Sequence, residues 1–519
     1  MKLRRALVSV HDKTGLAEFA QALVDRGVEL VAADGTEQFL RDEGVPVTSV
    51  DSHIGAPAMA TGSVAGVHPQ LQQALLWGRE KTDGNGNGAV ATDDDGGIGE
   101  RGFDIVVMNF TPFERVAMRR SSREDDIIEA IDITGPGLLR AAAKNFERVV
   151  VLADPEVYPL VLEELNERDG DLPYDVRKLL ASRAFDTCAH YELAIANWFS
   201  EAEDFPTYML RDYVKMSDLP YGENPHQRAA YYVEVGARRH LLSMVEQMQG
   251  GELTFNNLND LNTARGVIGD FTIPGCVIIK HAAPCGVAVS GDIAGAFERA
   301  LSADEPSAYG GVIAVNRTVD EATAENITKR FFEVIFAPNY TDEALEVLRK
   351  RPEMRVLVDR ERRTKSPGER DMRRVIGGLL VQDTDGDLEE REYMSVVTEA
   401  HPSEKQWGDL LFAWRVAKWV PSNAAVFAKE LTTVGIGGHL PSRIDSIDHA
   451  LKKAGDRVQG SMMAADAFIA FEDAAAHAID AGIAGLIQPG GADNDDAIIA
   501  MADKAGIPMV FTGRRHFRH

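Results

Sequence analysis

The sequence predicts an α/β fold, and three observations carry this prediction. Apolar strand-like segments alternate with amphipathic helical segments from residue 6 onward, which is the pattern of parallel sheets with crossover helices. Hydrophobic residues make up 45% of the chain and charged residues 26%, so it has the composition of a globular protein and not of a disordered or fibrous one. A length of 519 residues gives room for several domain-sized units.

The first 150 residues show the alternation most clearly. We predict strands at 6–10, 28–33, 103–109 and 149–153, helices over 14–26 and from residue 36, and a further apolar stretch at 45–50. Residues 81–102 are rich in Gly, Asp and Asn, which predicts a surface loop. Gly97, Gly99 and Gly102 match the dinucleotide-binding pattern, but they precede a strand instead of following one, so we reject that interpretation.

A polar, proline-containing segment at residues 201–206 marks the expected domain boundary, which gives domains of 1–203 and 204–519. Beyond it, apolar strands again alternate with alanine-rich helices, and the second half has room for two similar α/β units. The predicted strands are 276–279, 312–315, 424–428 and 484–487, and the predicted helices are 262–269, 293–302 and 471–481.

The charge balance argues against nucleic-acid and membrane-surface partners. The formal net charge is −26, which repels phosphate backbones and anionic lipids. Only 16 of the 55 basic residues are Lys, and a surface rich in carboxylates and poor in lysine suggests adaptation to high salt, with an ordinary acidic cytosolic protein as the alternative. Three cysteines without a C-x-x-C pair and no run of about 18 apolar residues lead us to expect a cytoplasmic protein.

Several local motifs have chemical potential. The segment 9–15 (SVHDKTG) turns from a strand into a helix and could hold an anion such as phosphate on its free N–H groups, although a simple helix cap explains it equally well. Lys280 and His281 follow a buried strand, where the lysine charge can keep the imidazole neutral and basic, while a structural histidine is the alternative. The loop 221–227 (YGENPHQ) gathers polar side chains in the manner of a ligand-binding loop.

A zinc site is not expected. His190 and Glu192 match H-x-E, and Cys285 opens the P-C-x-x-C pattern of zinc deaminases, but Ala288 stands where the second cysteine is needed. We therefore predict no metal ligands of this kind.

A dozen segments in order along the chain resemble the bifunctional AICAR transformylase/IMP cyclohydrolase family. They include SVHDKTGL, IDITGPGLLRAAAKN, YGENPHQ, LTFNNLND, KHAAPCGVA, SAYGGVIAVNR, VTEAHPS, PSNAAVFAK, GIGGHLPSR, AADAF, IQPGG and FTGRRHFRH.

This resemblance implies a methylglyoxal-synthase-like N-terminal domain and a C-terminal transformylase of two cytidine-deaminase-like α/β units without zinc. It implies a role in de novo purine biosynthesis. Formyl transfer from the co-substrate 10-formyltetrahydrofolate to the 5-amino group of AICAR gives FAICAR, and ring closure then gives IMP. The resemblance also implies a homodimer, and it leaves open a monovalent cation that occurs in some members.

Matching the family motifs to this sequence assigns the transformylase residues. The implied catalytic residues are Lys280, His281, the general base, and Asn423. The implied substrate contacts are Tyr221, Asn257, Gly310, Glu333, Arg443, Arg515, Phe517 and His519, and the implied folate contacts are Phe468 and Asp473.

The cyclohydrolase motifs are altered. Ser63, Ala65 and Thr111 stand where the family has a phosphate-binding Arg, a catalytic Lys and an active-site Tyr. The residues that remain are Lys13, Thr14, Gly35, Thr36, Asn109, Asp132 and Lys144. We expect a formyltransferase with a degenerate cyclohydrolase domain. The alternatives are a fully bifunctional enzyme and a non-catalytic nucleotide-binding subunit.

Overall fold

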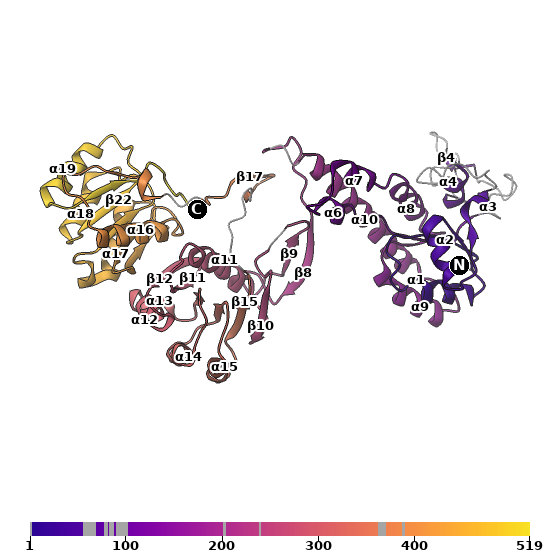
Figure 1. Ribbon diagram of the computed structural model, residues 1–519, viewed down its shortest axis with the longest axis horizontal. Coiled ribbons are helices and arrows are strands. Elements are labelled where there is room, and N and C mark those ends of the chain that lie inside the picture. The colour runs from indigo at the N-terminus through magenta and orange to yellow at the C-terminus, as the bar shows by residue number, and fades with distance from the viewer. Residues whose placement is uncertain are drawn as a thin grey trace. The chain divides into compact units, whose positions relative to one another are not determined.

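The computed structural model forms two compact units (Figure 1). It describes residues 3–54, 69–76, 81–82, 88–89, 102–200, 204–237, 240–361, 370–386 and 390–519. The first unit comprises Met1–Tyr213 and Glu234–Gly236, and the second comprises Val214–Val233 and Ala237–His519. The expected boundary at 203–204 adjoins residues 201–203, which lie outside the described residues.

The first unit is built on a five-stranded sheet in the order β3-β2-β1-β6-β7, with every neighbouring pair parallel. Its strands are β1 (Arg5–Ser9), β2 (Glu29–Ala32), β3 (Thr48–Ser49), β6 (Ile105–Met108) and β7 (Val150–Leu152). The predicted parallel α/β arrangement is confirmed. Within the predicted loop 81–102, the structure describes only the backbone of β4 (Lys81–Thr82), β5 (Gly88–Ala89) and residue 102.

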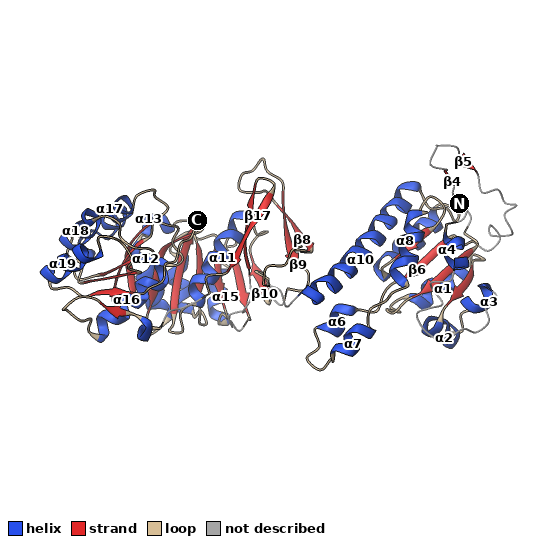
Figure 2. Ribbon diagram, turned by 90° about the horizontal axis from the view of Figure 1, so that it is seen from above, coloured by secondary structure: helices blue, strands red, loops and turns tan. Residues whose placement is uncertain are grey.

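Helices flank this sheet (Figure 2). The helices of this unit, of which α6 and α7 lie away from the sheet, are α1 (Leu16–Val24), α2 (Asp34–Asp42), α3 (Val50–Ile54), α4 (Pro69–Leu75), α6 (Phe113–Ala117), α7 (Glu124–Glu129), α8 (Gly135–Lys144), η2 (Pro155–Val157), α9 (Tyr158–Glu167) and α10 (Tyr174–Ser200). Helix α1 begins two residues later than its pattern predicts. The reason is that the Asp12 carboxylate accepts the Thr14 N–H in a turn and Gly15 has a positive φ of 66°.

The second unit is built on a twelve-stranded sheet in the order β10-β15-β14-β13-β11-β12-β20-β19-β21-β22-β23-β18. Its strands are β10 (Val245–Gln249), β11 (Gly275–Lys280), β12 (Ala283–Val289), β13 (Val312–Val315), β14 (Val334–Ala337), β15 (Arg355–Asp359), β18 (Ser395–Val396), β19 (Ala425–Lys429), β20 (Thr432–Gly437), β21 (Met462–Ala465), β22 (Gly485–Gln488) and β23 (Met509–Phe511). Two separate hairpins are β8 (Tyr213–Leu219) with β9 (Ala229–Glu234) and β16 (Arg370–Val375) with β17 (Gly378–Asp383).

The helices of this unit follow its strands. They are α11 (Phe255–Gly269), α12 (Ile293–Ala303), α13 (Glu305–Ala308), α14 (Glu321–Thr328), α15 (Asp342–Leu348), η3 (Arg391–Tyr393), α16 (Glu404–Ala417), α17 (Arg443–Ala454), η4 (Gly455–Val458), α18 (Glu472–Asp480) and α19 (Asp495–Ala505).

The second unit contains a structural repeat. The first copy runs β10-α11-β11-β12-α12-β13-α14-β14-α15-β15, and the second runs β18-α16-β19-β20-α17-β21-α18-β22-α19-β23. In both copies the first two strands after the first helix form an antiparallel hairpin, and the last three strands are parallel. The copies meet where β12 pairs antiparallel with β20 through Ala288 and Thr432. The two similar α/β units expected in the second half are therefore present.

The two copies share one hydrophobic core and keep two others separate. Helices α11 and α16 pack on one face of the sheet in a single cluster that includes Val277 of β11 and Val426 of β19. On the other face, α12, α14 and α15 pack on the first copy, and α17, α18 and α19 pack on the second. Alternate residues of each strand face the two sides, so Ile278 belongs to a different core from Val277.

Two glycines allow helices to lie close to this sheet. A Cβ at Gly286 of β12 would lie 2.0 Å from the carbonyl oxygen of Ala300 in α12. A Cβ at Gly435 of β20 would lie 2.2 Å from that of Ala450 in α17. The same close approach therefore occurs at the same place in both copies.

Candidate active site

The strand directions bring the two copies together at one edge of the twelve-stranded sheet. Strand β11 ends at Lys280 and β12 begins at Ala283. Because β12 and β20 are antiparallel, the start of β12 and the end of β20 lie at the same edge. Strand β19 begins there, and β21, β22 and β23 end there. We call this the Lys280 edge, and the opposite one, where β19 ends at Lys429, the Lys429 edge.

Most of the predicted transformylase residues come from segments at the Lys280 edge. Gly310 and Glu333 precede β13 and β14, which start at this edge. Residues at this edge in the second copy precede β19 or follow β20, β21 and β23; they are Asn423, Arg443, Phe468, Asp473, Arg515, Phe517 and His519. Contacts gather several of these residues into two clusters.

The first group, which we call the Lys280 cluster, consists of Lys280, His281, Asn257, Gly310 and Glu333. The Lys280 Nζ donates a hydrogen bond of 2.7 Å to the Gly310 carbonyl oxygen. Gly310 has a φ of 68°, and a Cβ there would lie 3.0 Å from Nζ, so glycine lets the lysine approach. Exposed His281 occupies the β11–β12 turn with a φ of 52°.

Asn257 joins the first turn of α11 to this cluster. It is buried, and its Nδ2 donates to Oε2 of Glu333 at 2.8 Å. It also forms a capping box with Thr254, since each side chain accepts the backbone N–H of the other residue. The Asn257 carboxamide is thus held by the protein on both its nitrogen and its oxygen.

The loop that carries Tyr221 is attached to the same helix. Its backbone is closed by a bond from the Gly222 N–H to the Gln227 carbonyl. Asn256 of α11 donates from Nδ2 to the Glu223 carbonyl at 3.2 Å. The half-buried Tyr221 therefore belongs to a loop that contacts the residue beside Asn257.

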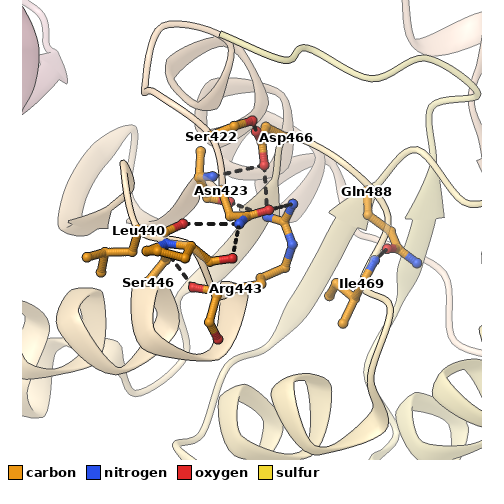
Figure 3. A network of polar contacts seen from close by, with 11 residues as sticks. Ser422, Asn423, Leu440, Arg443, Ser446, Asp466, Ile469 and Gln488 are labelled. Carbon is orange, nitrogen blue, oxygen red and sulfur yellow. Dashed lines mark hydrogen bonds and ion pairs between the residues drawn. The ribbon is translucent and has the colours of Figure 1, made fainter. Parts of the chain in front are cut away.

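The second group, which we call the Asn423 cluster, consists of Asn423, Arg443, Asp466 and Ser422 (Figure 3). The Arg443 Nη1 donates to Asp466 Oδ1 at 2.8 Å and to the Ala424 carbonyl at 2.7 Å. Asp466 is fully buried, and it also accepts the Ala424 N–H and the Ser422 hydroxyl. This is a buried ion pair whose polar atoms are well supplied with partners.

The Asn423 carboxamide is also engaged within the protein. Its Nδ2 donates to the carbonyl oxygens of Leu440 and Pro441 at 3.1 and 3.2 Å, and its Oδ1 accepts from Arg443 at 3.3 Å. A ligand oxygen that binds Nδ2 would replace one of these two carbonyls. The Asn423 cluster thus fixes the segment between β20 and α17.

The C-terminal tail presents its predicted site residues on one face. Burial alternates along the tail, with Arg515, Phe517 and His519 exposed and His516 buried. The Arg515 guanidinium lies 4.4 Å from the centre of the Phe517 ring. The tail is anchored where the Ser422 N–H donates to the Arg518 carbonyl at 2.8 Å.

Of the two predicted folate residues, Phe468 is 39% exposed and offers a ring face to a ligand. Its backbone neighbour Ile469 donates its N–H to Gln488 Oε1 at 2.7 Å, which fixes the chain at this point. Asp473 is exposed in the first turn of α18.

In the first unit, most of the predicted cyclohydrolase residues follow β1, β2 or β6 in the chain and so lie around the carboxyl ends of these parallel strands. Asn109 Oδ1 accepts the N–H groups of His11 and Asp12 at 2.7 and 2.8 Å. Buried Thr36 uses its hydroxyl to bond the Val10 N–H and carbonyl. These side chains hold the loop after β1, and exposed Gly35 stands beside Thr36 in α2.

The same loop contains Lys13 and Thr14. The Thr14 hydroxyl donates to Asp12 Oδ1 at 2.7 Å, and this hydrogen bond lowers the pKa of Asp12. The Lys13 Nζ lies 3.4 Å from the His11 carbonyl oxygen. The loop therefore carries both a cation, directed to backbone carbonyls, and a carboxylate bound by Thr14, which is a mixed environment for an anion.

Asp132 precedes the N-terminus of α8, and Lys144 is the last residue of this helix. Asp132 Oδ1 accepts the N–H groups of Thr134 and Gly135, and its backbone N–H donates to the Tyr191 hydroxyl. Lys144 is exposed in the last turn. Residues 62–68 of the altered motif, including Ser63 and Ala65, lie outside the described residues.

Comparison with known proteins decides the family. The model described as AICARFT/IMPCHase bienzyme matches residues 142–453, which is more than half of the chain. The chain belongs to this family. The model described as MGS-like domain matches residues 15–137. The AICARFT/IMPCHase family is one of purine biosynthesis, and its two parts follow each other here in the predicted order.

A solved structure titled "Crystal structure of ForH" is also similar to part of this family member. It has 27% sequence identity over 38% of this chain and 100% of that chain, with a TM-score of 0.32. That score is too low to support an argument.

Two buried aspartates of this AICARFT/IMPCHase protein contact predicted site residues or their neighbours and were not predicted from the sequence. Asp466 binds Arg443, and Asp260 of α11 accepts the Ala282 N–H at 2.6 Å just after His281. Both act on residues far from them in the chain, and so local patterns do not reveal them. The segment 254–260 does carry a signal, because 403–409 repeats its spacing of Ser/Thr, amide and Asp.

The described residues contain neither a metal-binding cluster nor a membrane-spanning helix. No group of three His, Cys, Asp or Glu side chains in that part of the chain is arranged to hold a metal ion. No helix among the same residues is long and apolar enough to cross a bilayer.

Proposed function

We propose that this protein transfers a formyl group from 10-formyltetrahydrofolate to the 5-amino group of AICAR, giving FAICAR. The observation that carries the proposal is the Lys280 cluster. In this cluster a lysine ends β11 and an exposed histidine follows it in the turn, at the edge of the sheet where most of the other predicted transformylase residues lie. Membership of the family supports the same reaction.

His281 serves as the general base in this proposal. The AICAR amine is delocalised into an imidazole ring and a carboxamide, so it needs to lose a proton as it attacks the formyl carbon. An exposed imidazole in a fixed turn can reach such an amine. Lys280, the residue before His281 in the chain, is held by its hydrogen bond to the Gly310 carbonyl oxygen.

The C-terminal tail and the Asn423 cluster supply the remaining contacts. Arg515 is an exposed cation suited to the phosphate of the nucleotide, and Phe517 beside it offers an aromatic face. Phe468 offers a second aromatic face, for the pterin. Asn423 holds the formyl oxygen once Nδ2 is released from a carbonyl of the 440–441 segment.

The formyl transfer test uses AICAR and 10-formyltetrahydrofolate with separation of FAICAR from IMP. We expect FAICAR to form, and His281→Ala to reduce the rate by about two to four decades. His449→Ala, an exposed histidine on α17, is the matched control and should retain the rate. Absence of formyl transfer by the wild-type protein, or an unchanged rate in His281→Ala, contradicts the proposal.

We further propose that the cyclohydrolase step is very slow or missing. Thr111 stands where the family has Tyr, and its hydroxyl reaches less far than a phenol. The side chains of Asn109 and Thr36 are engaged in holding the loop after β1. Loss of a donor to a developing oxyanion costs several kcal/mol, so FAICAR should accumulate.

Purified protein given FAICAR and followed for IMP absorbance tests this second proposal. Conversion of FAICAR to IMP at about one turnover per second, a typical enzymatic rate, would establish the bifunctional alternative. The double change Ala65→Lys with Thr111→Tyr should raise IMP formation if those two side chains are what the domain lacks.

The proposed assembly is a cytoplasmic homodimer that needs salt. Each chain carries a formal charge of −26, and screening shortens the repulsion to a Debye length of about 3 Å near 1 M salt. Sedimentation over a salt series should show dissociation at low salt. A stable dimer at about 10 mM salt, where the Debye length is about 30 Å, contradicts this expectation.

A further inference from the structure

The structural repeat gives the Lys280 turn a counterpart at the other edge of the sheet. In the first copy, His281 and Ala282 form a two-residue turn between β11 and β12, with φ values of 52° and 59°. In the second copy, Glu430 and Leu431 form the turn between β19 and β20, with φ values of 55° and 58°. Neither turn contains glycine, although both residues of each are left-handed.

The lysine before each turn is also held in the same way. Lys280 donates to the Gly310 carbonyl at 2.7 Å, and Lys429 donates to the Gln459 carbonyl at 2.8 Å. Left-handed conformations are costly for residues with a Cβ, and they persist only where surrounding groups hold them. The repeat therefore directs attention to the groups that hold the backbone of each turn.

An aspartate at the same helix position binds each turn. Asp260 is the sixth residue of α11, and its Oδ1 accepts the Ala282 N–H at 2.6 Å. Asp409 is the sixth residue of α16, and its carboxylate accepts the N–H groups of Glu430 and Leu431 at 3.0 and 2.6 Å. Both aspartates are buried, with exposures of 9% and 4%.

The helices that carry these aspartates are fixed by matching caps. Thr254 and Asn257 form a capping box at the start of α11, and Ser403 and Gln406 form one at the start of α16. Each capping box sets the axial position of its helix, and thereby the height at which the aspartate meets the turn. The device is the same in both copies, but only the first turn carries histidine.

We propose that Asp260 is a positioning residue for formyl transfer, which fixes the His281 side chain by holding the backbone of the next residue, Ala282. The inference rests on the proposed function. Burial raises the pKa of Asp260, and the hydrogen bond from the Ala282 N–H opposes that rise. Holding both turn residues left-handed sets the direction of the His281 Cα–Cβ bond, and a base displaced by about 1 Å can lose about a hundredfold in rate.

The second copy supplies the matched control for this proposal. Asp260→Ala removes one hydrogen bond from its turn and Asp409→Ala removes two from the same kind of turn, so both should lower the thermal midpoint. Only Asp260→Ala should lower kcat of formyl transfer, by about tenfold or more, with KM for AICAR changed less than about threefold. Asp409→Ala should keep kcat within about twofold of the wild type.

A conservative variant distinguishes the effect of the hydrogen bond from Ala282 to Asp260 from the effect of side-chain packing alone. Asp260→Asn keeps an oxygen that can accept the Ala282 N–H, so kcat should return to within about threefold of the wild type. Should Asp260→Ala fail to fold, Asp260→Ser takes its place, because it keeps a polar group but is too short to reach the amide. Equal kcat in Asp260→Ala and Asp409→Ala, or no recovery in Asp260→Asn, overturns the proposal.

Amide hydrogen exchange tests the positioning without any substrate. Exchange at Ala282 should accelerate in Asp260→Ala and stay unchanged in Asp409→Ala, while Leu431 should show the reverse. Unchanged exchange at Ala282 overturns the positioning role even in an active enzyme. If the wild-type protein is inactive but exchange at Ala282 accelerates in Asp260→Ala, the proposed function is overturned, while the hydrogen bond from the Ala282 N–H to Asp260 is established.

Discussion

Removing Arg443 should destabilise the second unit strongly, because its guanidinium neutralises a buried carboxylate. The side chains of Arg443 and Asp466 are 9% and 0% exposed, and their atoms lie 2.8 Å apart. Arg443→Met keeps most of the packing volume but leaves the buried Asp466 carboxylate without its cation. It also removes the donor from the Ala424 carbonyl and from Asn423.

The expected loss is about 3–5 kcal/mol, the usual cost of leaving one partner of a buried ion pair uncompensated. The Ser422 hydroxyl and the Ala424 N–H still bind Asp466 and keep the loss toward the lower end of that range. Arg360→Met is the control, since Arg360 pairs with Glu246 at side-chain exposures of 61% and 54%. That exposed pair should contribute about 0–1 kcal/mol.

Calorimetry of both variants measures the difference. The transition of the second unit must be followed separately, because two units need not unfold in one step. A loss in Arg443→Met no greater than that in Arg360→Met would refute the reasoning. Arg443 would then be free to serve mainly as a ligand for substrate, as the sequence motif alone implies.

Three further predictions concern the close packing, the tail and the thiols of this protein. Gly286→Ala should destabilise the second unit by about 1–3 kcal/mol or more, because the Cβ would meet the Ala300 carbonyl, whereas Gly291→Ala has open space and should be neutral in the same thermal melt. Deletion of residues 515–519 should abolish formyl transfer, and a fully active truncated protein would show that the tail does not bind substrate. Native protein at pH 8 should react slowly with a thiol reagent, whereas denatured protein should react fully, because burial disfavours the thiolate form. Burial raises the pKa of Cys188 to about 11 and that of Cys285 to about 12, and it also raises the pKa of Cys276.

Local patterns in the sequence predict much of the fold but misplace some helix starts. The alternation of apolar segments predicts the parallel sheet of the first unit, since buried strands and crossover helices differ in period. Helix α11 was expected over 262–269 but begins at Phe255, because Thr254 and Asn257 cap a polar first turn that looks like a loop. The hairpin of β16 and β17 has no clear alternation, and both of its faces are largely exposed.

The site could be predicted only in part, for a related reason. Motifs identify Lys280 and His281 because they are neighbours in the chain, at the end of β11 and in the turn that follows it. They do not reveal that Arg443 is bound to Asp466, since that partner comes from another strand end. Pairings across the sheet depend on strand order, which a local sequence window does not contain.

The arrangement of cores has a consequence for how the second unit loses structure. Helices α11 and α16 belong to one continuous cluster that spans both copies, so the copies melt together when this cluster is weakened. The clusters on the other face are confined to one copy each, so we expect a large-to-small substitution there to promote partial unfolding of that copy alone. The face of α11 and α16 therefore sets the cooperativity of unfolding for the whole unit, and the other face determines which copy opens first.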